Sequence, residues 1–199
     1  MRRLILAMSA ALWLAACSSG GSTSSTGGSI TGATSGTTGL FMFVILTPPD
    51  FSSDTKSSDC TVPPDGVIDQ FVTSDIGSVT ITIRDNSLVA TTSNKGVVFT
   101  SYTVSYTPIT PGGPALASRR QSESIPVVLG DDDEASATAP VVLVELDTTK
   151  PEFNARNPAG KVYTYNITVT FRGSRIDTGA PVAVSGSTSM ELGDFCEGT

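Results

Sequence analysis

Residues 162–171 read VYTYNITVTF and carry the clearest secondary-structure signal in this 199-residue chain. Apolar and polar side chains alternate along almost the whole stretch. One face would hold Tyr163, Tyr165, Ile167, Val169 and Phe171, and the other Val162, Thr164, Asn166, Thr168 and Thr170. A period of two over this length predicts a β-strand with one face against a core.

Other stretches repeat this alternation. Residues 78–84 read SVTITIR and place Val79, Ile81 and Ile83 on one face. In residues 97–106, VVFTSYTVSY, the predicted common face consists of Val98, Tyr102, Val104 and Tyr106. Less regular candidate strands cover residues 40–46, 67–73, 87–92, 125–129, 140–146 and 180–192. Several short strands of this kind predict an all-β domain.

Turn-forming residues separate the candidate strands, as in Thr107–Pro114, Gly130–Asp133 and Asn157–Gly160. No stretch after the N-terminal apolar segment shows helical periodicity. The pattern predicts one antiparallel β-sandwich over residues 40–199. Tyr102-x-Val104-x-Tyr106 resembles a strand of immunoglobulin-like and fibronectin type III domains, and SGSTS at 185–189 resembles a strand of uncharacterised envelope lipoproteins. The first resemblance implies an immunoglobulin-like topology.

The N-terminus has the layout of a secretory signal peptide over residues 1–16. Two arginines precede an apolar run that ends in Leu14-Ala15-Ala16-Cys17. The run is shorter than the roughly 20 apolar residues that a membrane span needs. Leu14-Ala15-Ala16-Cys17 closely resembles the bacterial lipobox. That resemblance implies that Cys17 receives a diacylglycerol, that the signal is cleaved before it, and that the new amino terminus is acylated. It also implies sorting to the outer membrane, because Ser18 stands where an aspartate would favour the inner membrane.

Residues 17–39 are predicted to form the lipidated cysteine and a flexible linker. From Ser18 to Gly39 every residue except Ile30 and Ala33 is Ser, Thr or Gly. Such a composition cannot bury enough apolar surface to offset the entropy cost of ordering. We therefore expect a tether that keeps the domain near the membrane without fixing its orientation.

Cys60 and Cys196 are the two cysteines that remain after Cys17. An exported protein meets an oxidising compartment, so we expect these two residues to form a disulfide. The alternative is two separate buried thiols. A disulfide closing a loop of this length would contribute about 5 kcal/mol in the chain-entropy model.

The composition argues against catalysis and against nucleic-acid binding. The chain has no histidine, which excludes Ser-His-Asp and Cys-His nucleophile systems, and it has no P-loop, Rossmann or Gly-x-Ser-x-Gly motif. Its net charge of −7 disfavours nucleic acid and anionic lipid surfaces as partners. We expect no enzyme activity and no cofactor. A hydrolase with two carboxylates flanking a cleft is the distant alternative.

An acidic run, Asp131, Asp132, Asp133 and Glu134, has two interpretations. It could supply oxygen ligands for calcium, or it could be a solvated hairpin loop whose charges repel one another. We expect the solvated loop, and therefore no metal site.

Residues 40–46, LFMFVIL, are consecutively apolar. They could form a first strand buried on both faces, or a segment that docks on a partner by strand addition or in a groove, with Phe41, Phe43 and Ile45 as the candidate contact residues. The resulting expectation is a lipid-anchored binding or structural module of the bacterial envelope. The alternative is an accessory subunit of a larger surface or export assembly that docks through residues 40–46.

Overall fold

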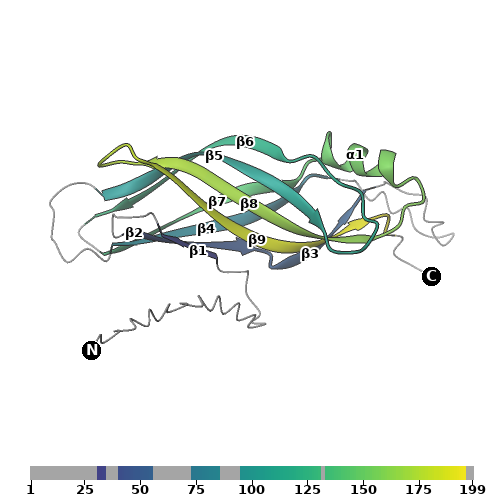
Figure 1. The fold of residues 1–199 in the computed structure, drawn as a ribbon, viewed down its shortest axis with the longest axis horizontal. Helices are drawn as coiled ribbons and strands as arrows, with labels where there is room; N and C mark the ends of the chain where they lie inside the picture. The colour runs from purple at the N-terminus through teal and green to yellow at the C-terminus, as the bar shows by residue number, and fades with distance from the viewer. Residues whose placement is uncertain (1–30, 35–39, 56–72, 86–94, 131–132, 196–199) are drawn as a thin grey trace, which may run out of the picture.

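The computed structural model describes residues 31–34, 40–55, 73–85, 95–130 and 133–195. Two β-sheets pack face to face in these parts of the chain (Figure 1). The elements are β1 (Thr31–Thr34), β2 (Leu40–Thr47), β3 (Asp50–Asp54), β4 (Asp75–Asp85), β5 (Lys95–Pro108), β6 (Arg119–Leu129), β7 (Glu134–Val144), α1 (Thr149–Arg156), β8 (Tyr163–Arg175) and β9 (Pro181–Gly193). The prediction of an all-β sandwich is confirmed.

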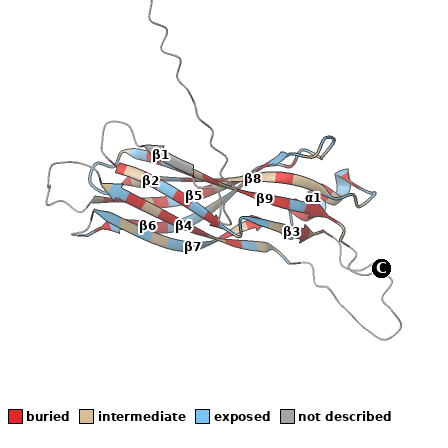
Figure 2. Ribbon diagram, turned by 90° about the horizontal axis from the view of Figure 1, so that it is seen from below, coloured by how far each residue is buried: buried red, intermediate tan, exposed pale blue. Residues whose placement is uncertain are grey.

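One sheet has the strand order β1-β2-β4-β7 and the other β3-β9-β8-β5-β6. All neighbouring strands run antiparallel except β3 and β9, which are parallel. Buried and exposed residues alternate along the strands (Figure 2), as expected where each sheet has one face in the core and one in solvent.

The strand predicted from VYTYNITVTF is β8, and its two faces are as expected. Tyr165, Ile167, Val169 and Phe171 have no exposed surface. β8 lies between β5 and β9, so both of its backbone edges are paired. Its central place explains why its sequence pattern is the most regular, because every inward position meets the opposite sheet.

β5 corrects one part of the sequence-based expectation. Tyr102, Val104 and Tyr106 are buried as predicted, but the buried large apolar side chains before them are Val97 and Phe99, and Val98 is only partly buried. The register with β8 shifts between Phe99 and Ser101, so β5 carries one extra residue there. This β-bulge reverses the alternation, which strict period-two reasoning does not foresee.

Glycine is needed in β8 opposite this bulge. Gly173 is the register partner of Phe99. A Cβ atom at position 173 would lie 2.1 Å from the carbonyl oxygen of Val98 and 2.6 Å from Cα of Phe99. Both are backbone atoms, so a side chain at this position would force the two strands apart.

Three elements were not expected. Asp50–Asp54 forms β3, in a region where no strand was predicted. Thr31–Thr34 forms β1, although the linker was expected to extend through Gly39. Helix α1 lies at one end of the sandwich (Figure 1) and packs through Phe153, whose ring meets those of Tyr163 and Tyr165 nearly at right angles with centroids 6.3 Å apart. With one large buried apolar side chain, α1 leaves no helical periodicity in the sequence. The predicted strands at 67–73 and 87–92 lie outside the described residues, except Thr73, which is not in a strand.

Buried tyrosines join separate parts of the sandwich through their hydroxyl groups. The hydroxyl of Tyr106 on β5 donates to the carbonyl of Leu143 on β7 at 2.7 Å, and Tyr165 on β8 donates to the carbonyl of Pro114 at 2.8 Å. Burial raises the pKa of Tyr106 and of Tyr165 to about 12. The Tyr102 hydroxyl accepts from the N–H of Val142 at 3.0 Å.

Candidate functional site

The odd-numbered residues of β2 form an outward apolar stripe, which we call the β2 stripe: Phe41, Phe43 and Ile45. Phe43 and Ile45 are 38% and 37% exposed, and Phe41 is partly buried. The even-numbered residues point into the core and are almost completely buried. Of the two interpretations of residues 40–46, burial on both faces is therefore wrong, because Phe43 and Ile45 are exposed and within the described residues no further layer covers the outer face of this sheet.

Main-chain pairing restricts how a partner could use β2. β1 pairs with Phe41–Val44 on one edge, and β4 pairs with the whole strand on the other. The backbone hydrogen-bonding groups along Phe41–Val44 therefore already face strands on both sides, which leaves no room for strand addition there. The exposed side chains remain as the means of contact.

Small polar side chains border the β2 stripe on the side of β4 and β7. On the neighbouring strands, Thr80 bonds to Thr138 at 3.0 Å and Thr82 bonds to Ser136 at 2.7 Å. These pairs run from β4 to β7 across the outer face, and they satisfy one another without a ligand.

Charge on this face is balanced within the described strands. Arg84, beside Phe41 in the register of β2 with β4, forms an ion pair with Glu134 at 3.2 Å. From this ion pair toward the α1 end, the outward positions of β2, β4 and β7 that lie outside the β2 stripe carry Ile, Thr, Ser, Pro or Val. The β2 stripe is thus an apolar patch in a locally neutral surface of an acidic chain.

A buried polar cluster at the α1 end was not foreseen from sequence. Ser53 donates to Oδ2 of Asp75 at 2.6 Å, and Nζ of Lys150 lies 3.1 Å from the same oxygen. Lys150 also donates to the carbonyl of Asp54 at 2.7 Å. Nearby, Asn154 donates to the carbonyl of Thr55 at 2.8 Å. Ser53 is 0% and Lys150 3% exposed, so no substrate reaches them, and the cluster instead fixes α1 to β3 and β4.

Among the described features, a depression in the outer surface beside β3 and β9 most resembles the two-carboxylate cleft that the hydrolase alternative requires. Its lining includes two carboxylates, Asp50 and Glu191, together with Phe51, Ser52, Thr164 and Ser189. Both carboxylates are exposed to solvent. Catalytic acids in glycosidases are partly desolvated, so this arrangement lacks the environment that general acid catalysis needs.

The acidic run is described only in part. Asp131 and Asp132 lie outside the described residues. Glu134 pairs with Arg84, and the carbonyl of Asp133 accepts from the N–H of Asp85 at 2.8 Å. Among the residues that the structure describes, no group of three histidine, cysteine, aspartate or glutamate side chains is placed to hold a metal ion.

All three cysteines, Cys17, Cys60 and Cys196, lie outside the described residues. The chain segments that lead to the last two are nevertheless neighbours. Asp54 is the register partner of Gly193, and the N–H of Thr55 donates to the carbonyl of Gly193 at 2.9 Å. Cys60 and Cys196 follow these paired residues by five and three positions in the sequence.

No protein-family model matches the chain, and a search of curated proteins returned no match. In the described part of the chain no helix has the length and apolar character of a transmembrane segment. Inferences about function therefore depend on the sequence motifs and on the surfaces described above.

Proposed function

We propose that this chain is a lipid-anchored, non-enzymatic protein of the bacterial outer membrane, whose β-sandwich acts as a binding or structural module. The observation that carries the proposal is Leu14-Ala15-Ala16-Cys17 at the end of a short apolar run, followed by a Ser/Thr/Gly-rich segment. Acyl chains on Cys17 would hold the protein at the membrane durably, since two or more chains are needed for stable anchoring.

Two further observations support the proposal. In the polar cluster that most resembles catalytic machinery, Ser53 and Lys150 are buried and both are bonded to the partly buried Asp75. The pairing of Thr55 with Gly193 brings the segments before Cys60 and Cys196 together, which favours the expected disulfide and thus an oxidising compartment.

The anchor is tested by fractionating cells that express the wild type and a Cys17→Ser variant. The wild type should be recovered from membranes, and mass spectrometry should show an N-terminal Cys17 carrying lipid. Cys17→Ser should accumulate as precursor or appear in the soluble fraction, while the matched control Ser19→Ala should behave as wild type. A wild-type chain that keeps Met1 and carries no lipid contradicts the proposal.

The sorting part of the proposal has its own test. Ser18→Asp should shift the lipidated protein from outer-membrane to inner-membrane fractions on a density gradient, and Ser18→Ala should not. Equal distribution of the two variants would contradict outer-membrane sorting without affecting the lipidation result.

A second candidate function is an accessory subunit of a larger envelope assembly, favoured by the exposure of Phe43 and Ile45. Cross-linking in intact cells followed by purification should then recover a partner in fixed stoichiometry. Replacing both residues with Ser should remove that partner without unfolding the domain, because both side chains point away from the core. Recovery of the same partner with the double variant would contradict this candidate.

A further inference from the structure

We infer that the β2 stripe rests against the lipid surface to which Cys17 is attached, so that the sandwich lies with its β1-β2-β4-β7 sheet toward the membrane. This inference rests on the proposed lipid anchor and goes beyond it, since a tether alone leaves the orientation of the domain open. It also replaces the expectation that the linker sets no preferred orientation.

The place where the chain enters the sandwich is the first observation. β1 is antiparallel to β2, and Thr31, its first residue, is the register partner of Val44. Val44 lies between Phe43 and Ile45 in the sequence, so the chain from the anchor joins the sheet beside the middle of the β2 stripe. A tether entering at a loop at one end of the sandwich would not bring this face close to the attachment point.

The short distance to the anchor is the second observation. Because β1 begins at Thr31, only the thirteen residues Ser18–Ile30 separate it from Cys17. They span at most about 45 Å when fully extended. A Ser/Thr/Gly-rich coil of this length has a typical end-to-end distance of about 20 Å. Short tethers of this kind give millimolar effective concentrations, at which weak surface contacts are substantially occupied.

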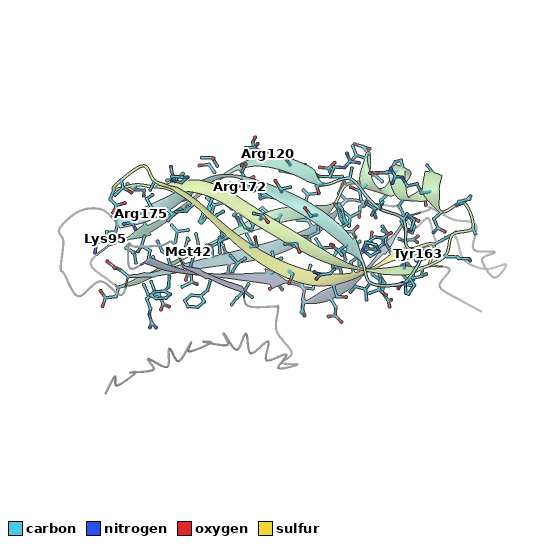
Figure 3. The ribbon with its side chains drawn as sticks, viewed as in Figure 1. Met42, Lys95, Arg120, Tyr163, Arg172 and Arg175 are labelled. Atoms are coloured by element: carbon cyan, nitrogen blue, oxygen red, sulfur yellow. The ribbon has the colours of Figure 1, made fainter. Side chains whose placement is uncertain are left out.

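The chemistry of the face is the third observation. An acidic protein is repelled by anionic lipid, but this face pairs its Arg84 with Glu134 and is otherwise uncharged over the outward positions named above. The outer face of the other sheet carries exposed charges instead, among them Asp50, Glu191 and the two arginines Arg120 and Arg172 (Figure 3). Apolar side chains on an otherwise polar surface are the groups that enter the boundary between headgroups and acyl chains.

A single introduced tryptophan can report the orientation. The only tryptophan of the chain, Trp13, lies in the predicted signal peptide, so the mature protein should contain none. Phe43→Trp places a fluorophore in the β2 stripe. Ser187→Trp, at an outward position of β9, is the matched control on the opposite sheet. The lipidated proteins are reconstituted into vesicles of phosphatidylethanolamine and phosphatidylglycerol with acyl chains brominated near the headgroup.

Bromine quenches tryptophan only at short range. We expect the brominated lipid to reduce the fluorescence of Phe43→Trp at least twofold relative to unbrominated vesicles, and that of Ser187→Trp by less than a fifth. Adding Ile45→Asp to Phe43→Trp should bring the quenching down to the Ser187→Trp level. Adding Thr168→Asp, on the opposite sheet, should leave it unchanged.

Co-flotation with the vesicles separates the two proposals. Protein that does not float with the vesicles contradicts the lipid anchor. Protein that floats while both tryptophans are quenched equally overturns the orientation and leaves the anchor intact, and it points to a protein partner as the occupant of the β2 stripe.

Discussion

The buried tyrosines predict that the domain loses stability in a defined alkaline range. In the folded protein Tyr106 is 7% and Tyr165 0% exposed, each donates a hydrogen bond to a carbonyl, and burial raises the pKa of each to about 12. In the unfolded chain tyrosine ionises near pH 10. Above pH 10 the unfolded state therefore releases protons first, and rising pH favours unfolding.

The size of the effect follows from the two pKa values. Stability from each tyrosine is fully present below pH 10 and is lost as the pH rises to 12. Linkage gives a loss of about 1.4 kcal/mol per tyrosine at pH 11 and at most about 2.7 kcal/mol per tyrosine above pH 12. Two such residues together remove about 3 kcal/mol by pH 11, a large share of the 5–15 kcal/mol typical of a domain.

Urea unfolding followed by circular dichroism at pH values from 8 to 11 measures this loss. Lysines also titrate in this range, so the tyrosine part is taken from the difference between wild type and the variants Tyr106→Phe and Tyr165→Phe. Each variant should cost about 1 kcal/mol at pH 8, because a buried carbonyl loses its donor. Each should also reduce the loss between pH 9 and 11 by about 1.4 kcal/mol.

Absorbance at 295 nm provides a second measurement, since the mature protein should contain four tyrosines and no tryptophan. Ionisation of all four near pH 10 in a chain that keeps its native circular dichroism would refute the reasoning. So would variants whose pH dependence equals that of the wild type.

Three further predictions concern the backbone, the buried lysine and the cysteines. Gly173→Ala should destabilise the domain by about 3 kcal/mol, because the new Cβ meets backbone atoms, whereas Gly130→Ala, with open space around it, should change the urea midpoint little. Lys150→Met should cost about 2–4 kcal/mol by leaving a partly buried carboxylate without its cation, and a change below 1 kcal/mol in urea unfolding would contradict this. Non-reducing peptide mapping of envelope-derived protein should recover Cys60 joined to Cys196, and two free thiols would contradict the disulfide.

Strand patterns in the sequence predicted much of the fold because the inner faces meet a dry core. β8 and β4 follow strict alternation over their central residues, and both were placed correctly. β6 and β7 were found only in their apolar halves, since Arg119–Ser124 and Glu134–Ala139 carry few large apolar side chains. Pairing with neighbouring strands, rather than burial of large side chains, extends these strands.

Other features depend on contacts that a linear pattern does not contain. The bulge in β5 is defined by its pairing with β8. The strand β1 forms because β2 offers a free edge to a segment whose composition predicts a coil. Lys150 follows two threonines in a region where neither a strand nor a helix was predicted, and only the tertiary structure brings it to Asp75. For the candidate site, the period of two in a β-strand places Phe41, Phe43 and Ile45 on the face opposite their even-numbered neighbours. Because residues 40–46 are all apolar, the sequence did not show which of the two faces points outward.

The position of β9 has a consequence for the order in which the protein can be assembled. β9 follows every other strand along the chain, yet it lies inside its sheet, between β3 and β8. β3 has no strand partner except β9 within the described sheets, so it stays unpaired until residues 181–193 are available. When the chain is delivered from its N-terminus, by the ribosome or through an export channel, this sheet therefore stays incomplete until its last strand arrives. Pairing of β9 with β3 and β8 is therefore the step that completes this sheet.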